Sequence, residues 1–162
     1  MPPVPSIPDV PLEGLYGAFI IDHYRNPRNR HPVPDPDMEA QDFNPFCGDQ
    51  VEVQAKLDPQ GRVTEVGFQA QGCSIIQASA SMMTEAMAGK SLDQLEELAS
   101  RFRQLMQGQL PWDEEGADLG DLAALQVVRL YPVRIKCALL PWATLEEGIG
   151  RWRSRNGAGP AA

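Results

Sequence analysis

The sequence predicts an α+β domain, in which a small antiparallel β-sheet carries helices packed on one face. Two runs of alternating apolar and polar residues are separated by a turn, as in a β-hairpin. Runs with helical periodicity precede this hairpin once and follow it several times, so strands and helices are segregated along the chain. The length of 162 residues, with 43% apolar and 22% charged positions, is that of one domain with its own core.

The first helix is expected close to the proline-rich start of the chain. One face of it is formed by residues at helical spacing: Leu15, Tyr16, Phe19, Ile20 and His23. A proline disfavours helical conformation in the residue before it, so the helix should stop before Asn26-Pro27. The next segment, from Pro27 to Pro45, is rich in Pro, Asn and Asp, and we expect it to be irregular.

The hairpin follows this segment. In its first strand the apolar residues Val51, Val53, Ala55 and Leu57 alternate with Glu52, Gln54 and Lys56. The sequence Asp58-Pro59-Gln60-Gly61 is typical of a turn, and Val66, Phe68 and Ala70 then alternate again. Gly72 should end the second strand.

Helices are expected through the rest of the chain. The first ends at Gly89, and one face of it is formed by Ile75, Ile76, Ser79, Met82, Met83, Ala86 and Met87. The second begins with a capping box of Ser91 and Gln94, and its apolar residues are Leu92, Leu95, Leu98, Phe102 and Leu105. A short helix from Leu122 to Tyr131 follows, and then a helix from Pro132 to about Trp152 that is kinked at Pro141. The acidic segment from Leu110 to Asp121 is expected to be a solvated insertion, with a docking surface as the alternative.

One domain should therefore span residues 12–153, between a disordered proline-rich segment at 1–11 and a flexible tail at 154–162. The net charge of −8 disfavours nucleic acid as a partner. No run approaches the roughly 18 apolar residues of a membrane span, and residues 1–11 do not resemble a secretory signal. We therefore expect a cytoplasmic protein.

The three cysteines, Cys47, Cys73 and Cys137, are too few for a disulfide framework. Cys47 precedes the first strand of the hairpin and Cys73 follows the second, so antiparallel pairing should make them neighbours. Asp49 lies two residues from Cys47. Three thiolates and one carboxylate are a plausible four-coordinate set for Zn²⁺, although the spacing does not fix the distance from Cys137 to the others.

Each residue also has a simpler interpretation. Cys137 lies in the apolar run from Ile135 to Leu140, where a cysteine can be a small core residue. The methionines of the first helix after the hairpin are expected to pack in the core. We expect His23 at the polar edge of its helix and His31 in an exposed loop, and neither as a ligand.

Four motifs resemble the NifU/IscU family of iron–sulfur cluster assembly proteins, and more narrowly its SufU branch. They are the helix at 20–24 followed by Asn26-Pro27-Arg28-Asn29; the loop Asn44-Pro45-Phe46-Cys47-Gly48-Asp49; the run from Gln71 to Met83; and Arg134-Ile135-Lys136-Cys137-Ala138-Leu139. IscU-type scaffolds carry a histidine where this chain has Lys136. The insertion from Gly108 to Asp121 is also similar to that of the SufU branch.

The resemblance implies a zinc-dependent sulfurtransferase that works with a SufS-type, PLP-dependent cysteine desulfurase and supplies downstream iron–sulfur assembly proteins. It implies that Cys47, Asp49, Cys73 and Cys137 bind the zinc and that Cys47 accepts the sulfur. It also implies that Arg134 lies at the desulfurase interface.

Two alternatives remain open. The same four side chains could hold an iron–sulfur cluster, which would make the protein a scaffold that assembles and transfers it. The protein could also be a structural zinc domain that only binds other proteins.

Overall fold

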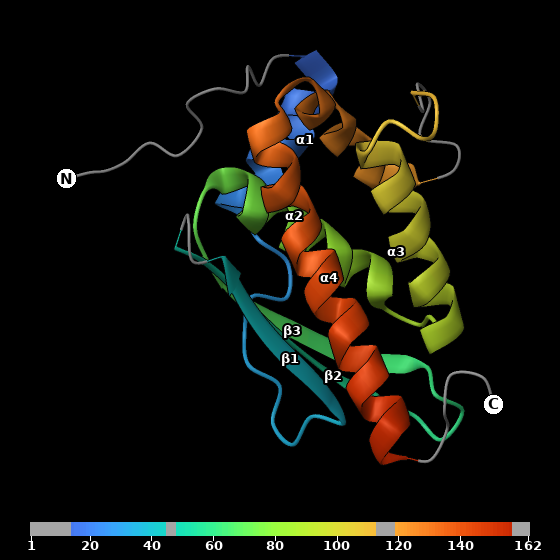
Figure 1. The fold of residues 1–162 in the computed structure, drawn as a ribbon. Coiled ribbons are helices and arrows are strands. Elements are labelled where there is room, and N and C mark those ends of the chain that lie inside the picture. The colour runs from blue at the N-terminus through green and yellow to red at the C-terminus, as the bar shows by residue number, and fades with distance from the viewer. Residues whose placement is uncertain (1–13, 45–47, 113–118, 157–162) are drawn as a thin grey trace.

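The computed structural model describes residues 14–44, 48–112 and 119–156. Their elements in chain order are α1 (Gly14–Arg25), β1 (Met38–Asn44), β2 (Asp49–Leu57), β3 (Val63–Gln71), α2 (Ser74–Met87), α3 (Leu92–Met106), the 3-10 helix η1 (Gly120–Leu130) and α4 (Pro132–Arg155) (Figure 1). The segment predicted at 1–11 lies outside these ranges. So does most of the tail predicted at 154–162, of which Ser154 and Arg155 belong to α4.

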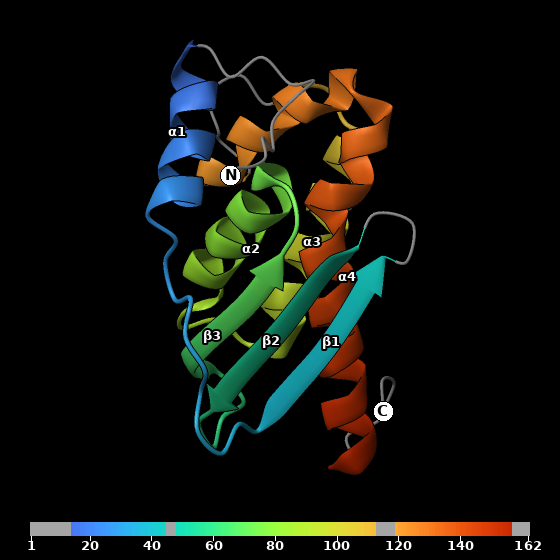
Figure 2. The ribbon, with the colours of Figure 1, turned by 90° about the vertical axis from the view of Figure 1, so that its left-hand side faces the viewer.

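The described residues form a three-stranded antiparallel sheet in the order β1-β2-β3. Figure 2 shows the strands in front and helices α2, α3 and α4 behind them, on one face of the sheet. Along β2, buried Val51, Val53 and Ala55 alternate with more exposed residues, as the sequence pattern predicts. The predicted α+β class and the predicted hairpin are confirmed.

Strand β1 corrects the expectation that the whole segment from Pro27 to Pro45 is irregular. Met38 and Ala40 are buried, whereas Glu39 and Gln41 are exposed, and the strand pairs with β2 along its full length. Its next inward residue is Asp42, whose carboxylate accepts a hydrogen bond of 3.5 Å from Thr144 of α4. This polar residue at an inward position hides the alternation from sequence analysis.

Helices α2 and α4 fill the space between the sheet and the outer helices. The buried face of α2 includes Ile75, Ile76, Met83 and Met87, and the ring of Trp142 on α4 lies 5.1 Å from that of Phe102 on α3. Burial of these large apolar side chains stabilises the packing of the helices on the sheet. The methionines therefore pack in the core, as predicted.

The ends of the helices agree closely with the sequence signals. Ser91 and Gln94 form the predicted capping box at the start of α3. The segment expected as a short helix at 122–131 is a 3-10 helix, η1, and α4 continues three residues beyond Trp152. Within the described ranges, no helix is both long and apolar enough to cross a membrane.

Candidate metal centre

The candidate centre lies where β2 begins, β3 ends, α2 begins and the second turn of α4 passes. Asp49 is the first residue of β2, and Gln50 pairs with Gln71 at the end of β3, so Asp49 and Gly72 face each other one position further on. Cys73 follows Gly72 and precedes the first turn of α2. The hairpin thus brings Asp49 against Gly72, the residue that precedes Cys73.

Cys137 reaches the same place from α4. Its Sγ lies 3.5 Å from Oδ2 of Asp49, and the thiol donates a hydrogen bond to that carboxylate. Cys137 and Asp49 are only 3% and 4% exposed, whereas Cys73 is half-buried. A buried carboxylate is costly unless it is paired, so this arrangement of donors needs an explanation beyond core packing.

The two described thiols also interact with each other. A hydrogen bond with Cys137 lowers the pKa of Cys73 to about 6, and backbone N–H groups of Ile75 and Ile76 in the first turn of α2 act in the same direction. The same hydrogen bond raises the pKa of Cys137, and burial adds to this effect. The thiolate form is therefore favoured at Cys73 and disfavoured at Cys137.

Arg134 lies next to both sulfur atoms. Its hydrogen bond with Cys137 lowers the pKa of that thiol, and its positive charge lowers the pKa of Cys73. Lys136, which follows it by two residues, is exposed. The predicted role of Arg134 at a partner interface stays a prediction, because its described contacts are within the chain.

Cys47 lies outside the described residues, so the predicted ligand set is described in three of its four members. On either side of the undescribed residues 45–47, the Gly48 N–H donates a hydrogen bond of 2.8 Å to the Asn44 carbonyl. Across 14–44, 48–112 and 119–156, no group of three or more His, Cys, Asp and Glu side chains is already arranged to hold a metal ion. Cys137 contacts both Asp49 and Cys73, and two thiolates with a carboxylate suit Zn²⁺.

Neither histidine belongs to the centre. His23 was expected at a polar edge, but it is buried between α1 and α2, with Nδ1 2.8 Å from the Ser81 hydroxyl and Nε2 3.7 Å from Glu85. His31 is exposed, as predicted.

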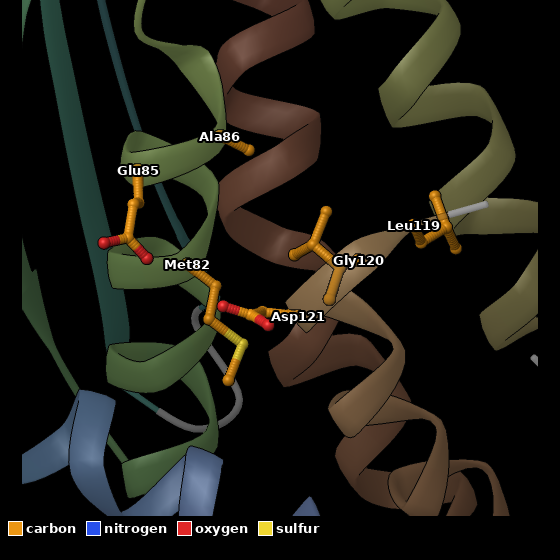
Figure 3. A pocket seen from close by; sticks show the side chains of 7 residues that line it. Met82, Glu85, Ala86, Leu119, Gly120 and Asp121 are labelled. Carbon is orange, nitrogen blue, oxygen red and sulfur yellow. The ribbon is translucent and has the colours of Figure 1, made fainter. Parts of the chain in front are cut away.

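A separate pocket opens between α2 and the start of η1. Figure 3 shows its lining: Met82, Glu85 and Ala86 on α2, and Leu119, Gly120 and Asp121 opposite them, with Leu122 completing the set. It contains no cysteine. The described end of the acidic insertion, Asp121, lies at this pocket rather than at the candidate centre, and residues 113–118 of that insertion lie outside the described ranges.

Sequence analysis missed one residue of the centre. Gly72 was expected only to end a strand, yet its backbone has φ of +139° and lies against the Asp49 carboxylate. The available signal was its position opposite Asp49 in the hairpin.

Most of the chain is similar to known proteins. Residues 15–158 match the model of the NifU-like N terminal domain. The chain is 42% identical to the zinc-dependent sulfurtransferase SufU of Bacillus subtilis, over 90% of this chain and 96% of that protein. It is 37% identical to the iron–sulfur cluster assembly scaffold protein IscU of Streptococcus pyogenes, over 86% of each chain.

Among solved structures, it is similar to a protein described as an iron–sulfur cluster assembly scaffold for the SUF system, from Fervidobacterium islandicum AW-1. The TM-score is 0.73 and the sequence identity 31%, with 81% of this chain and 93% of that chain covered.

Proposed function

The chain belongs to the NifU-like N-terminal domain family, and we propose that it is an iron–sulfur cluster assembly protein that accepts persulfide sulfur on Cys47 from a cysteine desulfurase. Similarity to the B. subtilis zinc-dependent sulfurtransferase over nine-tenths of the chain favours this activity. The observation that carries the proposal is the approach of Asp49, Cys73 and Cys137 from three separate elements. Such a set of soft and carboxylate donors has no evident role in core packing.

In this proposal Cys47, Asp49, Cys73 and Cys137 hold one Zn²⁺. When bound, Zn²⁺ keeps cysteine sulfur deprotonated at neutral pH and has no redox chemistry of its own. Asp49 and Cys137 fit this role because both are buried and directed at each other. Cys73 fits because the first N–H groups of α2 already favour its thiolate.

The residue that reacts is Cys47. Its thiolate attacks the outer sulfur of a cysteine persulfide on the desulfurase, and a new S–S bond forms on Cys47. The S–S bond of the desulfurase breaks, and its cysteine leaves as a thiolate. The sulfur changes carrier with no net oxidation, so no further reactant is required.

Arg134 supports the same chemistry from the chain's own side. Its guanidinium lies beside the two described thiols and favours their anionic forms. We place it at the face that a SufS-type desulfurase contacts. The protein would act in the cytoplasm, where thiols stay reduced, and would pass sulfur to downstream iron–sulfur assembly proteins.

The proposal is tested by the effect of the zinc-loaded protein on desulfurase turnover. The wild-type chain should stimulate a SufS-type enzyme strongly, and Cys47→Ala should reduce the rate to that of the desulfurase alone. If Cys47→Ala stimulates as well as wild type, Cys47 is not the acceptor.

A second candidate is a scaffold that assembles a cluster on the same residues, which the 37% identity to the S. pyogenes scaffold protein favours. Anaerobic reconstitution with iron and sulfide separates the two. A stable, transferable chromophore would favour the scaffold, whereas a colourless protein that keeps its zinc favours the sulfurtransferase.

A further inference from the structure

Gly72 approaches the Asp49 carboxylate more closely than any other residue type could. A Cβ built on Gly72 would lie 2.3 Å from Oδ1 of Asp49 and 2.9 Å from its Cγ. Both distances are far inside van der Waals contact, so a side chain at this position and the present place of the carboxylate exclude each other.

The other wall of this space is a tightly packed core residue. The same Cβ would lie 3.0 Å from Cγ2 of Ile76, which is fully buried in the core on the first turn of α2. Movement of Ile76 would disturb the packing of α2 against the sheet. Asp49 is the end of a side chain, so rotation of its carboxylate is the less costly way to relieve the clash.

Rotation of Asp49 would break the arrangement of the candidate centre. Its Oδ2 is the atom that accepts the hydrogen bond from Cys137, and the carboxylate is 4% exposed. We propose that Gly72 is a positioning residue, which keeps open the space that directs the Asp49 carboxylate toward Cys137 and so sets the affinity of the centre for zinc. This inference rests on the proposed function, because it takes Asp49 as a zinc ligand.

Backbone strain is the competing explanation for a glycine here. The φ of +139° at Gly72 is one that residues with a side chain rarely adopt. Gly61, in the turn at the opposite end of the hairpin, supplies a control. It also has positive φ, +80°, but a Cβ on it would meet nothing within 4 Å. Gly61→Ala therefore introduces backbone strain without displacing a carboxylate.

The experiment is a double-mutant cycle read out as zinc affinity, by competition with a chromophoric chelator. It uses the full chain as wild type, Gly72→Ala, Asp49→Ala, the double variant and Gly61→Ala. We expect Gly72→Ala to weaken zinc binding about 10–100-fold, as loss of support for a metal ligand does. In the Asp49→Ala background the same change should matter by less than about twofold, and Gly61→Ala should bind zinc as wild type does.

Other outcomes overturn the proposal. It fails if Gly72→Ala binds zinc like wild type, or if it weakens binding equally with and without Asp49. Should Gly72→Ala fail to fold, folding of the double variant would support the proposal, because only the carboxylate distinguishes the two chains. If neither folds, backbone conformation alone requires the glycine. Wild-type zinc affinity in Asp49→Ala would instead refute the ligand set of the proposed function.

Discussion

The middle and the start of helix α2 differ in how their buried polar groups find partners. In its middle, the Ser81 hydroxyl accepts a hydrogen bond from the Arg28 N–H and contacts His23 Nδ1, each at 2.8 Å, and Thr84 hydrogen-bonds the Ser81 carbonyl at 2.9 Å. At its start, Cys73 interacts with Cys137, whose thiol in turn reaches Asp49 at 3.5 Å. In the first set, ordinary hydrogen bonds within the protein pair the polar groups. In the second set, the thiols form only weak hydrogen bonds, although thiolates and carboxylates are strong metal ligands.

Burial of polar groups therefore does not by itself identify a metal site. His23 is as buried as Cys137, but its Nδ1 is hydrogen-bonded to the Ser81 hydroxyl, and this contact ties α1 to α2. At the candidate centre, sulfur atoms are the partners, and a cation would satisfy them better than they satisfy one another. Substitutions in the two regions should therefore change different quantities.

The largest effect is expected at the candidate centre. Cys137→Ser should weaken zinc binding by at least about 10–100-fold, because it replaces a thiolate ligand and also alters the partner of Asp49. The measurement is zinc affinity by chelator competition, with Ser79→Ala, a buried change on α2, as the control. Unchanged zinc affinity in Cys137→Ser would show that Cys137 is a core residue and not a zinc ligand.

A core substitution in the middle of α2 should lower the free energy of unfolding and leave zinc binding unchanged. Met83 is fully buried, so Met83→Ala should cost about 2–5 kcal/mol of unfolding free energy by creating a cavity. Urea denaturation of the folded chain measures this cost. Zinc content per folded chain should not change, and its loss would show that the two regions are not separate.

Ser81→Ala probes the satisfied polar set. It leaves the Arg28 N–H and His23 Nδ1 without their shared partner, at an expected cost of about 1–3 kcal/mol. Denaturation again measures it, and exposed Thr64→Ala serves as the control. A cost no greater than that of the control would mean that water replaces the hydroxyl.

The smallest effect is a change in acid sensitivity. Burial lowers the pKa of His23, and the charge of Arg28 adds to this, although Glu85, Asp22 and Asp121 oppose it. As pH falls below about 6.5, the unfolded chain therefore binds a proton before the folded chain does, and stability decreases. His23→Gln should flatten this decrease in denaturation midpoints, while His31→Gln should retain it. If the stability of His23→Gln decreases as steeply with falling pH as that of wild type, groups other than His23 cause the acid sensitivity.

Much of the fold and part of the centre could be predicted from the sequence. The alternation around residues 51–57 and the turn at 58–61 predicted the hairpin, whose pairing of Gln50 with Gln71 brings the start of β2 to the end of β3. The predicted proximity of Cys47 to Cys73 stays a prediction, because Cys47 lies outside the described residues. Four motifs predicted the family, which is confirmed by the match over residues 15–158.

The remaining features depend on tertiary packing. Strand β1 was missed because Asp42 points inward and finds its partner, Thr144, on a helix about a hundred residues later. The approach of Cys137 to Asp49 likewise depends on how α4 packs against the sheet, and no spacing in the sequence encodes that distance. The need for glycine at position 72 follows from the position of the Asp49 carboxylate, which only the folded structure gives.

The most direct test of the account is to locate the sulfur after transfer. The zinc-loaded chain is incubated with a SufS-type desulfurase and cysteine, and its cysteine-containing peptides are then analysed by mass spectrometry. We expect one added sulfur atom on Cys47 and none on Cys73 or Cys137. A chain that stays unmodified, or one that carries the added sulfur on Cys73 or Cys137 instead, would contradict it.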